Sequence, residues 1–85
     1  MKRAKKKVSP RTATAIDAYI AIQMRDRRIA LGVTQDALGK KLGISFQQVQ
    51  KYEAGTNRVS ASRLFEICKV LKIPLTSMFE HDPMA

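Results

Sequence analysis

Three polar side chains in the middle of the chain have the spacing of a single exposed helix face. On a helix of about 100° per residue, Gln47, Gln50 and Lys51 lie on one arc, and Val49 and Tyr52 lie opposite. A glutamine amide can bond N6 and N7 of adenine together, and a lysine ammonium can reach O6 and N7 of guanine. The arc therefore suits contact with base edges, although its polarity alone fits a solvated face equally well.

The residues around this arc predict two short helices joined at Gly43. Thr34 and Ser45 each precede a run of apolar residues with helical periodicity, where a side-chain oxygen can accept a hydrogen bond from the first helical turn. Ser45 and Gln48 have the Ser-x-x-Gln spacing of a capping box. Gly43 can take the left-handed conformation that ends a helix. Two helices held at a steep angle by such a turn form the unit that lays its second helix into the DNA major groove, which favours base contact.

Apolar spacing predicts the helices that support this unit. A first helix is expected over residues 17–31, a fourth after an N-cap at Ser60, and a short fifth from Pro74 or Leu75 to Phe79. Gly32 and Gly55 should also follow helix ends, and Pro74 should close the fourth helix. The expected core residues are Ile20, Met24, Leu31, Leu64, Ile67, Cys68 and Leu71. The predicted fold class is all-α, a five-helix bundle.

Three apolar pairs have the spacing of a hydrophobic staple across a helix start. They are Val33 with Leu38, Ile44 with Val49, and Val59 with Leu64. Near the end of the chain, we expect one of Met78 and Phe79 to fill the core, and the other could meet a second subunit.

From about residue 20 to residue 80 the chain resembles the Cro/C1-type (XRE-like) helix-turn-helix family of lambdoid phage repressors and bacterial regulators. The matching strings are RRIALGVTQDALGKKLGIS and FQQVQKYEAGTNRVSASRLFEICKVLKIP. The string GISFQQVQKYEAGTNRVSASRL is also similar to alphaproteobacterial regulators. The resemblance implies a lambda repressor-like fold and sequence-specific binding to double-stranded operator DNA. We therefore expect a transcriptional regulator, more specifically a repressor, that acts in the cytoplasm as a homodimer.

The resemblance also implies roles for individual residues. The positions that contact bases in the family correspond here to Ser45, Phe46, Gln47, Gln50 and Lys51. Gln35 would contact a phosphate and brace Gln47, while Arg28 and Glu53 would form a structural ion pair. The loop of Thr56, Asn57 and Arg58 would meet phosphates. Phe46 replaces a polar residue of many phage repressors and could pack on its own domain or touch a thymine methyl.

The positive charge is concentrated near the N-terminus. The chain has 85 residues and a formal net charge of +9, and residues 1–11 hold six Lys and Arg with no acid. We expect residues 1–15 to form a flexible arm, in which Lys5, Lys6 and Lys7 add salt-dependent affinity for phosphates. The arm has three alternative uses: wrapping around the duplex, nuclear localisation and attraction to anionic lipid. The last two are disfavoured because no apolar stripe or lipidation signal accompanies the charge. For Arg25 and Arg27, an electrostatic or structural role is favoured over DNA contact.

Catalysis, metals and cofactors find little support in the residues. Cys68 is the only cysteine and falls on an apolar stripe, and His81 is the only histidine. No Ser/His/acid set can be assembled, so we expect no enzyme. We also expect no metal, no cofactor, no membrane contact and no small-molecule domain. The expected domain spans residues 16–80, with the helix-turn-helix at 34–55 and a tail at 81–85. The competing functional hypotheses are a protein-interaction module, such as an antitoxin or co-activator, and, with less support, an RNA binder.

Overall fold

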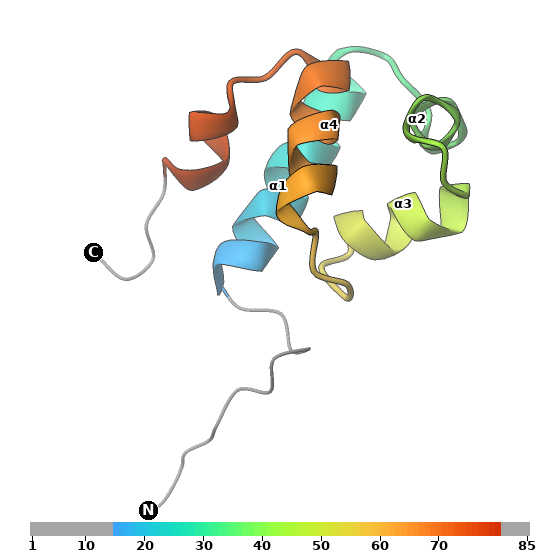
Figure 1. Ribbon diagram of the computed structural model, residues 1–85. Helices are drawn as coiled ribbons and strands as arrows, with labels where there is room; N and C mark the ends of the chain where they lie inside the picture. The colour runs from blue at the N-terminus through green and yellow to red at the C-terminus, as the bar shows by residue number, and fades with distance from the viewer. Residues whose placement is uncertain (1–14, 81–85) are drawn as a thin grey trace, which may run out of the picture.

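The computed structural model describes residues 15–80. Within this range the chain forms four α-helices followed by a 3₁₀ helix, and no strand (Figure 1). The helices are α1 (Ala15–Ala30), α2 (Gln35–Leu42), α3 (Phe46–Glu53), α4 (Ala61–Leu71) and η1 (Leu75–Phe79). Helix α4 lies across α1, with α2 and α3 on one side and η1 on the other. None of the described helices is long and apolar enough to cross a membrane.

Side-chain hydroxyls begin three of these helices, as the sequence predicts. Thr34 accepts a hydrogen bond from the N–H of Ala37 at 3.0 Å, and Ser45 accepts one from the N–H of Gln48 at 3.1 Å. Ser60 caps α4 in the same way, through the N–H of Arg63 at 3.2 Å. Each hydroxyl satisfies an amide that has no partner inside its helix. The starts of α2, α3 and α4 are therefore fixed by local chemistry.

All four α-helices end in a left-handed residue. After α1, α2 and α3 that residue is Gly32, Gly43 and Gly55, with φ between +70° and +76°, and these three predictions are confirmed. After α4 it is Lys72, with φ +56°. The N–H of Ile73 donates to the carbonyl of Cys68 at 3.1 Å, so the turn at Lys72 ends α4 before the chain reaches Pro74. No glycine occurs at this turn, so its position was not predictable from the residue type.

The core joins all five elements. Met24, Leu38, Val49, Ile67, Leu71 and Met78 are fully buried, with Ile20, Leu64 and Cys68 almost so. The staple residues Val33, Ile44 and Val59 pack partly buried against the core clusters. Met78 is thus the residue of the last element that fills the core, while Phe79 remains 51% exposed. The buried stripe predicted for α4 is confirmed at each of its four positions.

Two predictions about the elements need correction. The first helix spans Ala15–Ala30 rather than residues 17–31, and Leu31 is exposed. Leu31 lies in the turn beyond the end of α1, where the helical periodicity that placed it in the core no longer applies. The last element is a 3₁₀ helix, so the described chain has four α-helices, not five. Its bounds match the predicted alternative that begins at Leu75, and Pro74 precedes η1 as its N-cap residue.

Candidate nucleic-acid interface

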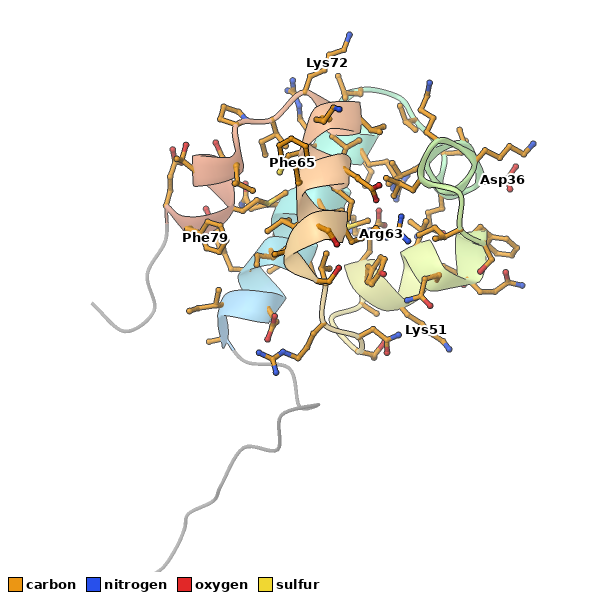
Figure 2. The ribbon with its side chains drawn as sticks, in the orientation of Figure 1. Asp36, Lys51, Arg63, Phe65, Lys72 and Phe79 are labelled. Atoms are coloured by element: carbon orange, nitrogen blue, oxygen red, sulfur yellow. The ribbon has the colours of Figure 1, made fainter. Side chains whose placement is uncertain are left out.

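Helix α3 presents one polar face to solvent and one apolar face to the core. Gln47, Gln50 and Lys51 are exposed, whereas Val49 is fully buried and Tyr52 packs partly buried against the same core cluster. The division predicted from the helical wheel is therefore confirmed. Figure 2 shows Lys51 extending from α3 away from the rest of the domain. The exposed arc supplies amide donors and acceptors and one ammonium, which are the groups that base edges and phosphates accept.

Phe46 and Ser45 stand at the start of this face. Phe46, the first residue of α3, is 40% exposed, so its ring neither joins the core nor projects fully into solvent. The exposed Ser45 uses its hydroxyl as the cap of α3. Both residues lie beside the polar arc.

A glycine within α2 permits the tight turn that precedes α3. A Cβ atom on Gly39 would lie 2.7 Å from the carbonyl oxygen of Ile44, which is too close for a side chain without backbone movement. The N–H of Ile44 also donates to the carbonyl of Gly39 at 2.9 Å. Gly39 thus sets how closely the start of α3 approaches α2. Gly39 belongs to none of the motifs found in the sequence, although a glycine inside a helix lowers helix stability and can signal a close packing contact.

Glu53, the last residue of α3, connects three elements. Its carboxylate accepts hydrogen bonds from Nε and Nη2 of Arg28 at 2.6 and 3.0 Å, and from Nε2 of Gln35 at 3.1 Å. Arg28 also donates from Nη1 to the carbonyl of Val33 at 2.8 Å. The side chains of Glu53 and Arg28 are only 3% and 11% exposed. The expected Arg28–Glu53 pair is present and fixes α3 against α1 and α2.

Gln35 takes a different partner from the one that the resemblance implied. Its amide donates to Glu53, and the described hydrogen bonds include none between Gln35 and Gln47. Because an amide nitrogen carries two hydrogens, the second remains available to an external acceptor. Gln35 is half-buried and is the first residue of α2.

The loop after α3 is held by one carbonyl. The carbonyl oxygen of Lys51 accepts the N–H of Thr56 at 3.1 Å, its hydroxyl at 3.1 Å, and the N–H of Asn57 at 3.4 Å. For Thr56 to donate to a phosphate, one of these bonds would have to break. The side chain of Asn57 is exposed.

Arg58 is held by a carboxylate of α1. Its Nε lies 3.3 Å from Oδ2 of Asp17, and its side chain is 45% exposed. The guanidinium has five N–H donors in a fork, a geometry that suits anionic partners. Asp17 thereby orients Arg58 beside the loop after α3.

Other charged or reactive residues have structural roles. Arg27 donates from Nε to the carbonyl of Leu71 at 2.9 Å and from Nη2 to that of Lys72 at 3.1 Å, which ties α1 to the end of α4. Arg27 thus makes structural contacts of the kind favoured for it. Arg63, which the sequence analysis overlooked, bonds the carbonyl of Leu42 at 2.9 Å and joins α4 to α2 (Figure 2). Burial raises the pKa of the Cys68 thiol above its ordinary value and disfavours the reactive thiolate.

Some predicted residues lie outside the described range. Lys5, Lys6 and Lys7 of the arm and the tail residues 81–85 belong to this group, whereas Ala15, counted with the arm, begins α1. Among residues 15–80, no group of three or more His, Cys, Asp or Glu side chains is arranged to hold a metal ion.

Comparison with known proteins agrees with this geometry. A helix-turn-helix family model (HTH_3) matches residues 24–77. An uncharacterized HTH-type transcriptional regulator of Sinorhizobium medicae is 49% identical over 79 residues, which cover 93% of this chain and 53% of the relative. A relative in Rhodospirillum rubrum, described as an uncharacterized transcriptional regulator in the ATPase CF(0) region, is 48% identical over 69 residues, covering 81% of this chain and 64% of that protein. The chain thus spans about half the length of the first of these relatives.

A solved structure gives the same result for the fold. The P22 c2 repressor, in complex with a synthetic operator, superposes with a TM-score of 0.67 at 25% identity, covering 74% of this chain and 96% of that one. The family match covers both helices of the motif, the turn between them, all of α4 and parts of α1 and η1. The chain belongs to the Cro/C1-type helix-turn-helix family.

Proposed function

We propose that this protein binds operator DNA sequence-specifically as a symmetric homodimer and represses transcription. The observation that carries the proposal is the outward arc of α3, where Gln47, Gln50 and Lys51 are exposed on a helix that Glu53 fixes in place. In this arrangement α3 enters the major groove and its side chains meet base edges. Each subunit contacts one half-site, with half-site centres about 34 Å apart.

The proposed interface divides into residues that specify sequence and residues that supply affinity. Base contacts come from the arc together with Ser45 and the partly exposed Phe46, an apolar side chain of the kind that contacts a thymine methyl. Phosphate contacts come from Gln35, through its second amide hydrogen, from Asn57 and Arg58, and from Thr56 if its hydroxyl leaves Lys51. The lysines of the arm add a salt-dependent term that is independent of sequence. The protein would act in the cytoplasm, where operator DNA is accessible.

A double substitution in the arc tests the proposal. An operator is first selected from a random duplex library at two salt concentrations, so that specific and electrostatic binding can be separated. We expect Gln47→Ala with Lys51→Ala to abolish the preference for that operator, because each lost base contact costs about 1–3 kcal/mol, while binding to unrelated duplex persists. The matched control, Gln23→Ala with Lys40→Ala, removes the same two side-chain types from α1 and α2 and should retain the preference. An arc variant that protects the operator as well as the wild type does would exclude α3 as the recognition helix.

A further inference from the structure

A second surface of the molecule combines exposed apolar side chains with positive charge. A groove of about 400 Å³ lies between the C-terminal half of α4 and the segment that leads into η1. Phe65, Ile73 and Leu75 contribute apolar groups to its lining. Phe65 and Leu75 are 56% and 45% exposed, which is unusual for two large apolar residues that share a hollow. Water therefore covers apolar area here that a partner could bury.

Both charged residues that line this groove are lysines. Lys69 and Lys72 lie at it, and its lining includes no carboxylate. The Nζ of Lys69 lies 5.4 Å from the centre of the Phe65 ring, in cation–π contact. The ion pairs formed among residues 15–80 use Arg28, Lys40, Arg58 and Arg63, so neither groove lysine is neutralised by a described acid. The groove is thus apolar and bordered by positive charge.

The groove and the polar arc of α3 lie on different sides of the domain. Figure 1 shows η1 on the side of α4 opposite to α2 and α3. In Figure 2, Phe65 lies on the side of α4 that faces η1, Lys72 extends beyond the end of α4, and Lys51 extends from α3 in the opposite direction to Lys72. A ligand in the groove would leave the arc of α3 uncovered.

We propose that this groove binds an acidic amphipathic segment of a partner protein. The apolar side chains of the segment cover Phe65 and Leu75, and its carboxylates meet Lys69 and Lys72. A second copy of the chain in a symmetric pairing would instead bring its own Lys69 and Lys72 to a border that already holds these two lysines. The proposal goes beyond DNA binding and does not depend on it.

The test uses synthetic peptides and the full chain. The probe is a fluorescein-labelled amphipathic peptide of about 15 residues, roughly four helical turns, with Leu and Phe on one face and Glu and Asp on the other. One comparison peptide carries Lys in place of each acid, and a second has the same composition in scrambled order. We expect the acidic peptide to bind at least about tenfold more tightly than either comparison peptide, and its affinity should fall at high salt. Its binding should shift the amide NMR signals of residues 65–75.

Two pairs of matched variants locate the binding site. Leu75→Ser and Lys69→Glu should each weaken binding of the acidic peptide by about tenfold or more. Ile29→Ser and Lys40→Glu make the same kinds of change at exposed positions outside the groove and should retain wild-type affinity. Circular dichroism establishes that each variant is folded.

Three results would overturn the proposal. One is equal affinity of the groove variants and their controls. Another is binding of the basic or scrambled peptide as tight as that of the acidic peptide. The third is a wild-type dimer that does not bind the acidic peptide and that Leu75→Ser converts to a monomer, as measured by sedimentation equilibrium. That result would assign the groove to a second copy of the chain.

Discussion

At the residue scale, one buried carboxylate positions the candidate interface. Glu53 accepts three hydrogen bonds from Arg28 and Gln35, and all three side chains are wholly or partly removed from water. An ion pair of this kind adds little net stability because desolvation offsets most of the Coulomb attraction, but removing one partner leaves a buried charge without compensation. Its contribution is therefore the fixed orientation of α3.

Removing that carboxylate should be costly. We expect Glu53→Ala to lower the free energy of unfolding by about 3–5 kcal/mol, because the Arg28 guanidinium would remain buried without its partner. The midpoint of urea denaturation measures the loss. Glu66→Ala removes a carboxylate that pairs with Arg63 at 2.9 Å while 54% exposed, and should cost less than about 1 kcal/mol. Equal losses in the two variants would show that burial of Glu53 has no special effect.

At the element scale, the turn between α2 and α3 depends on two glycines for different reasons. Gly39 allows close approach, since its absent Cβ would collide with the backbone of Ile44. Gly43 supplies a φ of +73°, and a Cβ placed on it would meet nothing within 4 Å. Steric contact with neighbours thus limits the first position, and backbone conformation alone limits the second.

This difference gives a graded prediction at Gly43. We expect Gly43→Ala to destabilise the domain by about 1–2 kcal/mol, because alanine is strained in the left-handed region. Gly43→Asn should cost less, since asparagine enters that region more readily and the surrounding space is open. Thermal denaturation followed by circular dichroism ranks the two variants. A Gly43→Asn variant that is less stable than Gly43→Ala would indicate that side-chain volume, rather than φ, limits this position.

Most helix boundaries were predictable because the residues that start a helix act on amides a few positions away. Thr34, Ser45 and Ser60 cap their helices through hydroxyls only three residues from the amides they bind. The end of α4 could not be found in this way, because the left-handed residue is Lys72, and Arg27 of α1 bonds the carbonyls of Leu71 and Lys72. That end depends partly on a contact between residues more than forty positions apart, which no local pattern contains.

At the scale of the whole molecule, positive charge and polar readout groups are separated along the chain. Residues 1–11 carry six of the sixteen Lys and Arg and none of the acids, so most of the net charge of +9 precedes the helical domain. The arc of α3 carries one cation, Lys51, among neutral amides. In the proposed complex, long-range attraction comes chiefly from the N-terminal residues and discrimination comes from α3.

Deleting residues 1–11 tests this separation. We expect the plot of log K against log salt concentration to become shallower by up to about five units, because each phosphate contact contributes about 0.9 to the slope. The preference for the selected operator over unrelated duplex should change much less. An unchanged slope would remove the arm from the interface. Circular dichroism of the truncated protein establishes that the helical domain still folds.

Local sequence patterns were enough to predict the caps, the three glycine helix ends and the division of α3 into an inward and an outward face. These features depend on hydrogen bonds and backbone conformations within a few residues, together with the fixed helical period. Four other features depend on the packing of the helices: the partner of Gln35, the pairing of Arg58 with Asp17, the exposure of Leu31 and the groove beside Phe65. Each of these features follows from how whole helices pack together. Packing brings into contact residues that are far apart in the sequence, and no local sequence pattern indicates such contacts.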